Sequence, residues 1–314
     1  MTANKRILVV IDPTAASHPA LDRGSWLAKR LGAALELFIG AYHPHLEDGD
    51  FFDPGAIEKA RASLLENHTR KLRELATCPA AEGLAVTVDA RWDYPLHEGI
   101  VRKALDCKAD IVVKDTHYHS ILKRSILSNT DWNLIRTCPA ALWLVKPRAL
   151  GVRPCIVAAV DPLHERDKPA ELDHKILATA KALCSALAGE LHVFHAFDIA
   201  PVIAVSTNSM TMPISLPIQE LTDSLKKEHA EALYSLTDSH TIERSKVHMH
   251  QGGTRELLVA LTDQLRTDLV VMGAVSRGRL QRLFLGSTAE DVLDKLSCDV
   301  LIVKPDSFKE GHDH

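Results

Sequence analysis

The chain has 314 residues, of which 46% are hydrophobic, and it carries 41 acidic against 37 basic side chains. Domains usually contain about 100–200 residues, so this length predicts two domains, each large enough to bury its own core. A net charge of −4, without an aromatic-interleaved basic stripe, gives no support for nucleic acid as the main partner.

The start of the chain and its cysteines predict a cytoplasmic protein. The segment MTANKR runs directly into an apolar strand, so we expect no signal peptide. No apolar run approaches the roughly 18 residues that a membrane span needs. The six cysteines are scattered and form no Cys-x-x-Cys pair, as is typical of a reducing compartment and of small buried side chains.

Short apolar runs alternate with longer amphipathic stretches in both halves. Strands are expected at 7–11, 35–39, 111–113 and 142–145 in the first half, with helices at 20–31, 54–76 and 96–105. Helices are expected at 170–187, 218–237 and 254–265 in the second half. Near-continuous apolar strands between helices indicate an α/β fold with a parallel sheet covered on both faces. We predict two doubly wound, Rossmann-like, five-stranded parallel sheets of strand order 3-2-1-4-5.

The two halves form an internal repeat. ILVVIDP at 7–13 matches IVAAVDP at 156–162, so Asp12 corresponds to Asp161. ADIVV at 109–113 matches TDLVV at 267–271, and LVKP at 144–147 matches IVKP at 302–305. Repeats of this length indicate a duplicated domain. We expect domains at 1–148 and 153–306, a linker near 147–154 and a polar tail at 307–314.

Doubly wound sheets bind ligands beyond the carboxyl ends of the strands where the winding reverses. Here that point lies between strands 1 and 4 of each half. In the second half these strands end at Asp161 and at Met272–Gly273. In the first half they end at Asp12 and at Lys114–Asp115. We therefore expect a ligand site at each of these two edges.

The second half has a glycine-rich connection, GAVSRGRLQRLFLGSTAEDV at 273–292. Gly273 lets the backbone leave the strand close to a ligand. Gly286, Ser287 and Thr288 begin the next helix, where free N–H groups and the helix dipole favour an anion, and Arg277 and Arg279 could add charge. The same pattern is also typical of a tight turn in which Ser287 is only an N-cap.

Gly273 followed thirteen residues later by Gly286-Ser287 resembles the nucleotide loop of universal stress proteins, G-x2-G-x9-G-[S/T]. The strands IVAAVDP, LHVFHAF at 191–197 and CDVLIVKP at 298–305 fit that family too. The resemblance covers nearly the whole chain. The resemblance is greatest to the tandem-type E subgroup. The segments that support this are VIDP at 10–13, TDW at 130–132 and the stretch 286–292.

This resemblance implies a stress-response protein with the adenine nucleotide alpha hydrolase-like fold that binds ATP, with Mg²⁺, in its second half. It also implies that the two domains pack through their final strands and that two chains form a homodimer. The family's middle glycine falls on Ser276, with Gly278 two residues further on. The implied nucleotide contacts are Asp161, Pro162, Ala196, Met272, Gly273, Val275, Ser276, Arg277, Gly278, Gly286, Ser287 and Thr288.

The matching segment of the first half reads DTHYHSILKRSILSNTDW at 115–132. Asp115 stands in the place of Gly273, and Ser128 in that of Gly286. A carboxylate at that position repels phosphate, so we expect no ATP in this half.

The first half also predicts a candidate zinc site. Alternate residues of an extended segment point the same way, so Asp115, His117 and His119 could converge on an ion, with Asp12 nearby. His43, His45 and His97 could approach from neighbouring loops. Solvated loop histidines are the alternative.

The sequence contains no motif of the other enzyme classes that we considered. No G-x-S-x-G elbow and no Gly-Lys-Ser/Thr occurs, and the nucleotide loop offers no obvious general base, so at most a weak ATPase is expected. The apolar segment 202–218 could cover the nucleotide, line a pocket for an amphipathic ligand, or only pack over the protein. Three hypotheses therefore stay open: a nucleotide-binding stress protein, a nucleotide-inactive zinc-dependent interaction protein, and a carrier of an amphipathic small molecule.

Overall fold

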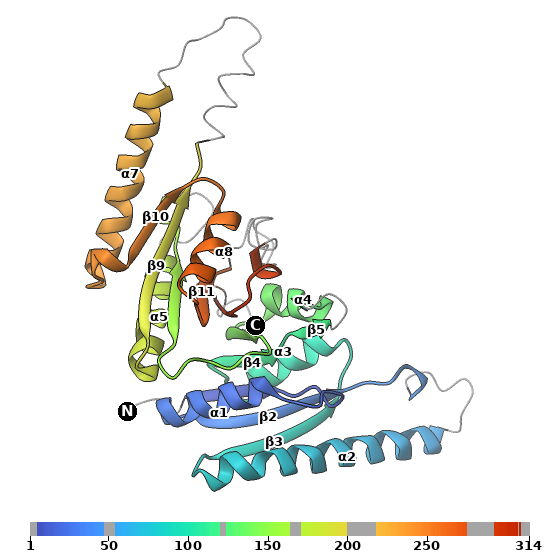
Figure 1. Ribbon diagram of the computed structural model, residues 1–314. Helices are drawn as coiled ribbons and strands as arrows, with labels where there is room; N and C mark the ends of the chain where they lie inside the picture. Colours follow the sequence, from blue (N-terminus) through green and yellow to red (C-terminus); the bar gives the residue numbers. More distant parts are fainter. Residues whose placement is uncertain are drawn as a thin grey trace, which may run out of the picture. The chain divides into compact units, whose positions relative to one another are not determined.

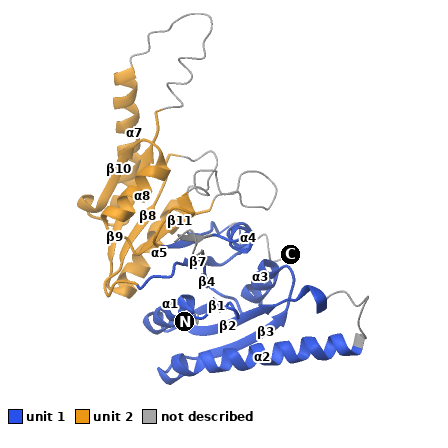
Figure 2. Ribbon diagram, turned by 45° about the vertical axis from the view of Figure 1, so that its right-hand side comes forward, with its two compact units in different colours: residues 1–149, 299–314 blue, residues 150–298 orange. Residues whose placement is uncertain are grey.

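The computed structural model describes residues 5–46, 54–119, 124–163, 171–199, 218–274, 292–306 and 308. The chain divides into two compact units, one of residues 1–149 with 299–314 and one of residues 150–298 (Figures 1 and 2). The last strand of the second repeat therefore belongs to the unit built by the first repeat. None of the described helices is long and apolar enough to cross a membrane.

Unit 1 has a parallel five-stranded sheet in the order β3-β2-β1-β4-β7. This order confirms the predicted 3-2-1-4-5 arrangement of the first half. The final strand β12 pairs antiparallel with β7, with Leu301 opposite Trp143. The elements of unit 1 are β1 (Arg6–Val10), α1 (Pro19–Leu31), β2 (Ala34–Ala41), η1 (Pro44–Leu46), α2 (Pro54–Ala81), β3 (Val86–Trp92), α3 (Leu96–Asp106), β4 (Ile111–Asp115), β5 (His117–His119), β6 (Arg124–Ile126), α4 (Asn129–Thr137), β7 (Ala141–Val145) and β12 (Asp299–Val303).

Helices cover both faces of the sheet in unit 1. A Cβ on Gly24 of α1 would lie 2.4 Å from Val9 Cγ2, so this glycine lets α1 approach the sheet. A Cβ on Gly40 of β2 would lie 2.5 Å from Leu96 Cδ1 of α3. Val9 faces the same side as Leu35 and Leu37, whereas Gly40 faces the other side because strand residues alternate. Helices α1 and α3 therefore pack on opposite faces, as in a doubly wound fold.

Buried charged side chains, Asp299 and Lys304, bond the final strand β12 to the rest of unit 1. The Asp299 carboxylate is fully buried and accepts hydrogen bonds from Arg23 Nε at 3.0 Å, Trp143 Nε1 at 3.1 Å and the Lys146 amide at 2.9 Å. Lys304 is also buried and donates to the carbonyl of Ile135, and burial lowers its pKa to about 7. A charge that loses water is tolerated only where such partners replace it, so these contacts fix the position of β12.

Unit 2 repeats the arrangement. Its described strands run parallel in the order β10-β9-β8-β11, which corresponds to 3-2-1-4. Helix α5 packs on β8 and β11. The elements are β8 (Cys155–Ala159), α5 (Glu171–Leu187), β9 (Glu190–Phe197), α7 (Ile218–Ser239), η3 (Arg244–Lys246), β10 (Val247–Gln251), α8 (Thr254–Gln264) and β11 (Leu269–Gly273).

The helices and strands expected within the described residues are present, with ends that differ by a few residues, and the helix expected to begin at 286–288 lies outside them. Helix α2 runs to Ala81, beyond the expected Ala76, and includes Pro79 in its last turn. The hairpin of β5 and β6 was not expected, because its strands have three residues each and no alternating apolar pattern.

Candidate functional site

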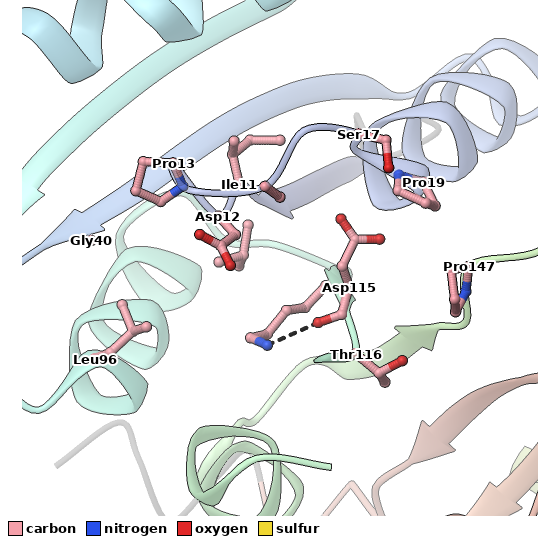
Figure 3. A pocket seen from close by; sticks show the side chains of 13 residues that line it. Ile11, Asp12, Pro13, Ser17, Pro19, Gly40, Leu96, Asp115, Thr116 and Pro147 are labelled. Carbon is pink, nitrogen blue, oxygen red and sulfur yellow. Dashed lines mark hydrogen bonds between the residues drawn. The ribbon is translucent and has the colours of Figure 1, made fainter. Parts of the chain in front are cut away.

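A hollow of about 390 Å³ lies at the switch point of the first half, beyond the ends of β1 and β4. Figure 3 shows the side chains of Asp12 and Asp115 entering it from these two neighbouring strands. The structure thus brings together two residues that the sequence placed at one sheet edge. We call this hollow the Asp12–Asp115 pocket.

Asp115 is held at the start of helix α1. Its Oδ1 accepts a hydrogen bond from the Ala20 amide at 2.7 Å. Its Oδ2 is buried and has no hydrogen-bond partner among the described residues. Burial raises the pKa of Asp115 to about 6, opposed by the Ala20 hydrogen bond and by the charge of Lys114. The carboxyl group is therefore ionised at neutral pH but incompletely paired.

The ammonium group of Lys114 is already neutralised. Its Nζ lies 2.8 Å from Asp131 Oδ1 and donates to the Asp115 carbonyl at 2.9 Å (dashed line in Figure 3). Asp131 is fully buried, and only 8% of the Lys114 side chain is exposed. Lys114 and Asp131 therefore neutralise each other beside the pocket.

The start of helix α4 is occupied by the chain's own side chains. Ser128 Oγ accepts from the Asp131 amide at 3.2 Å, and Asp131 Oδ2 accepts from the Ser128 amide at 2.7 Å. This capping box uses two of the amides that would bind an anion in the first half. The buried carboxylate of Asp131 at the start of α4 would also repel an anion.

Asp12 follows β1 and fixes the turn after it. Its Oδ1 accepts from the Thr14 amide at 2.8 Å and from the Thr14 hydroxyl at 2.6 Å. The remaining walls of the pocket are largely apolar: Val10, Ile11, Pro13, Ala15, Pro19, Leu96 and Pro147. The pocket therefore combines two carboxylates with an apolar lining.

The described part of the second half places three of the predicted nucleotide contacts on adjacent strands. Asp161 follows β8, Ala196 lies in β9 and Gly273 ends β11, while β8 pairs with both other strands. Pro162 and Met272 adjoin Asp161 and Gly273. The other predicted contacts, Val275, Ser276, Arg277, Gly278, Gly286, Ser287 and Thr288, lie outside the described residues, as does Arg279.

Gly273 has a packing role besides any role in binding. A Cβ at this position would lie 2.8 Å from Leu172 Cδ2 and 3.1 Å from Ile176 Cδ1 of α5. Asp161 is partly exposed, and its amide donates to Asp173 Oδ1 of the same helix at 3.2 Å. Helix α5 therefore lies directly against both strand ends that border the proposed nucleotide site.

A buried imidazole lies beside Asp161. His195 Nδ1 is 3.0 Å from the Val160 carbonyl and 3.9 Å from Asp161 Oδ1. Since a carbonyl only accepts, we assign the Nδ1 proton to His195, whose Nε2 then accepts from His229 Nδ1 at 2.8 Å. Burial lowers the pKa of His195. The pair holds the carboxyl end of β9 against α7.

The candidate zinc residues are only partly described. The backbone of His117 and His119 forms β5, but their side chains lie outside the described residues. His43 and His45 line a separate hollow of about 550 Å³ against α2. The described residues contain no group of three or more His, Cys, Asp or Glu side chains that could hold a metal ion. Zinc binding therefore stays a prediction.

Sequence reasoning missed two features of these sites. The Lys114–Asp131 pair joins residues from different elements, and no sequence pattern marked it. Imidazole pairing in the second half was also missed, although His248 and His250 alternate along a strand and could have suggested one histidine-rich face.

Comparison with known proteins identifies the family. The sequence model of the Universal stress protein family matches residues 3–146 and 156–304. The chain is similar to Universal stress protein E of Photorhabdus laumondii, with 27% identity over 312 residues and 98% of each chain covered. It is also similar to Universal stress protein E of Escherichia coli K12, with 27% identity and 98% and 96% covered.

Solved structures show the same fold. A functionally unknown protein from Pseudomonas aeruginosa PAO1 superposes with a TM-score of 0.74 at 24% identity, covering 98% of this chain and 95% of that one. A universal stress protein from Archaeoglobus fulgidus gives a TM-score of 0.59 at 15% identity, covering 96% and 98%. The repeated strand order, the strand-end residues and the two family matches agree, and the chain belongs to the universal stress protein family.

Proposed function

We propose that this universal stress protein binds ATP, with Mg²⁺, at the switch point of its second half and acts in stress tolerance. The observation that carries the proposal is Gly273, which ends β11 beside Asp161. The first half has Asp115 at the position of Gly273. No carboxylate stands at this strand end in the second half, and the Gly286-Ser287-Thr288 segment is expected to supply amides and hydroxyls to a phosphate.

The first half lacks these features, so we assign no nucleotide to it. The amides of Ser128 and Asp131 at the start of its α4 are bonded within the capping box. Its strand end carries the Asp115 carboxylate, which would face phosphate oxygens of the same sign. Only one nucleotide per chain is therefore expected.

Fast hydrolysis is not part of the proposal. Asp161 is the nearest described carboxylate, and its side chain is 42% exposed. His195 lies beside it, but both ring nitrogens are engaged, by Val160 and by His229. A general base must reach a water held against the phosphate; His195 cannot do so while Val160 and His229 engage its nitrogens, and the loop sequence offers no obvious base. We therefore propose a nucleotide-binding protein with at most slow ATPase activity.

Hydrogen exchange with and without MgATP tests the proposal within the second half. A ligand that binds only the folded state stabilises it, by about 2.7 kcal/mol at a hundredfold excess over Kd. We expect slower exchange at the ends of β8 and β11. Gly286→Asp should abolish the effect by placing a carboxylate against the phosphates, whereas the neutral control Gly286→Ala should retain most of it. Unchanged exchange in residues 150–298 of the unaltered protein would refute the proposal.

The zinc and carrier hypotheses have their own tests. Metal analysis of untagged protein, with a His117→Ala and His119→Ala double variant as control, decides the first, and unchanged zinc content in the variant would remove it. The carrier hypothesis places its ligand under the segment 202–218, of which residues 202–217 lie outside the described residues, and native mass spectrometry that finds a co-purified ligand would favour it. The predicted homodimer is checked by light scattering.

A further inference from the structure

We propose that helix α7 regulates the nucleotide site of the second half through His229 and His195, which position the peptide unit in front of Asp161. This role deepens the proposed function and rests on it, because the site concerned is the one to which ATP is assigned. A chain of hydrogen bonds runs from α7 through β9 to the end of β8. Docking of α7 and binding of nucleotide are therefore coupled.

The peptide unit between Val160 and Asp161 is held at both of its polar ends. The Val160 carbonyl accepts a hydrogen bond from His195 Nδ1 at 3.0 Å. The Asp161 amide donates to Asp173 Oδ1 of α5 at 3.2 Å. A peptide unit is planar, so hydrogen bonds at both ends fix the orientation of its plane. The Cα atom from which the Asp161 side chain extends lies in that plane and is fixed with it.

His229 determines which nitrogen of His195 carries the proton. Its Nδ1 lies 2.8 Å from His195 Nε2, which must accept because His195 Nδ1 donates to Val160. Burial lowers the pKa of His195, which keeps the ring neutral at about pH 7.5, as one donor and one acceptor require. Without a donor at position 229 the other tautomer becomes available, in which Nδ1 presents a lone pair to the Val160 carbonyl.

The bond from His229 depends on how α7 lies against β9 (Figure 1). The ring of His229 stacks on Phe197, the last residue of β9, and on His195, with 5.0 Å between ring centroids in each case. Leu233 and Leu236, which are buried, follow on the same face of α7 one and two turns later. Movement of α7 away from β9 would therefore break the hydrogen bond that sets the His195 tautomer.

The first half, to which no nucleotide is assigned, differs at this point. Strands β2 and β9 have the same register against β1 and β8, so Ile39 stands at the position of His195. Ile39 is fully buried and has no polar atom in its side chain, so it cannot hold the carbonyl that precedes Asp12. The imidazole at this position thus belongs to the half with the proposed nucleotide site.

Coupling of this kind is reciprocal. If docking of α7 raises the affinity for nucleotide by some factor, nucleotide must favour docking of α7 by the same factor. The loss of one buried hydrogen bond corresponds to a change in affinity of roughly threefold to tenfold. Both the affinity for MgATP and the protection of α7 are therefore measurable consequences.

Titration calorimetry of the full chain with MgATP tests the role of α7. His229→Leu removes the donor, and it should weaken binding by roughly threefold to tenfold. His229→Asn keeps a donor, because its amide nitrogen stands near the position of the imidazole Nδ1, and it should bind within about twofold of the unaltered protein. His248→Leu is the matched control, since it breaks the 2.9 Å pair with His192 on the opposite face of β9, and it should leave the affinity unchanged.

Two further measurements distinguish positioning from a general loss of stability. Long-range proton–nitrogen NMR spectra should show the Nδ1–H tautomer of His195 in the unaltered protein and in His229→Asn, but not in His229→Leu. MgATP should slow hydrogen exchange in α7 of the unaltered protein and of His248→Leu, but not of His229→Leu. Urea unfolding of each variant ensures that the affinities compared are those of folded proteins.

An MgATP affinity that His229→Leu leaves unchanged would overturn the role of α7 while nucleotide binding stands. The role is also overturned if His248→Leu or His229→Asn weakens binding as much as His229→Leu, since packing alone would then explain the loss. Protection at the ends of β8 and β11 without protection of α7 would have the same meaning. Failure of the unaltered protein to bind MgATP would refute the proposed function and this role together.

Discussion

The two halves share a strand order but bury different polar chemistry. The first half buries the charged pairs of Lys114 with Asp131 and Lys103 with Glu36, and its Arg23 pairs with the buried Asp299 of β12, which comes from the second repeat. The described second half joins imidazoles instead: His192 to His248 at 2.9 Å and His195 to His229 at 2.8 Å are partly buried, and His174 to His240 at 3.0 Å is exposed.

This difference shows that the duplicated scaffold fixes geometry and leaves the polar residues free to diverge. The position that ends the fourth strand is Asp115 in one half and Gly273 in the other. In the first half a carboxylate stands at this edge, and beside it Lys114 and Asp131 neutralise each other. In the second half the equivalents of these two residues are Met272 and Ala289, so no charged pair is required there.

The largest expected effect comes from breaking the Lys114–Asp131 pair. Lys114→Met leaves Asp131 fully buried without a counter-charge, which should cost about 3–5 kcal/mol of unfolding free energy. Tryptophan fluorescence in urea measures it, because all four tryptophans, Trp26, Trp92, Trp132 and Trp143, belong to the first half.

Two controls sharpen this measurement. Lys29→Met removes an ion pair with Glu82 whose side chains are 60% and 48% exposed, and it should cost less than about 1 kcal/mol. The double variant Lys114→Met with Asp131→Ala copies Met272 and Ala289, and it should cost less than the sum of the two single changes. A strictly additive double variant would show that the pair is not coupled.

The sequence predicted the fold well because apolar periodicity and the repeat carry that information directly. The runs at 7–11 and 35–39 became strands with almost every side chain buried. Asp12 and Asp115 were placed at one edge because parallel strands end together. The partners of Asp115 and of its neighbour Lys114 could not be foreseen. Ala20 reaches Asp115, and Asp131 reaches Lys114, only because helices pack at this edge of the sheet.

Other features depend on contacts between residues far apart in sequence. Asp299 bonds Arg23, Trp143 and Lys146, and nothing local at 298–305 indicates this. Gly273 was interpreted as a feature of ligand approach alone, but its contact with Leu172 and Ile176 gives it a packing role as well. A glycine in sequence does not distinguish these two requirements.

A smaller effect is expected at Asp115 itself. Its pKa in the folded protein, about 6, is above the ordinary 3.8, so the folded state binds more protons between these values and loses stability as pH rises through them. Asp115→Asn mimics the neutral acid and should stabilise the first half above about pH 7, by at most about 3 kcal/mol. At about pH 4 the variant and the unaltered protein should unfold at nearly the same urea concentration. A variant that is less stable at both pH values would show that the carboxylate is well compensated.

The smallest expected effect is a difference between the two halves in how much stability each loses in acid. Burial lowers the pKa values of His192, His195, His240 and His248, so the unfolded state binds more protons near pH 6.5 and the second half loses stability as pH falls below that value.

The imidazole pairs make this loss local. Two nitrogens 2.8–3.0 Å apart share one proton, and the hydrogen bond is lost when the accepting nitrogen is protonated as well, because both rings are then donors with positive charge. Each lost pair should cost about 1 kcal/mol, and hydrogen exchange in β10 and α7 should accelerate at about pH 5.5 after correction for intrinsic rates. His248→Gln, which bonds without titrating, should remove the acceleration in β10, whereas His97→Gln in the first half should not. If β2 and β10 respond equally to acid, the imidazole pairs do not determine how the two halves differ.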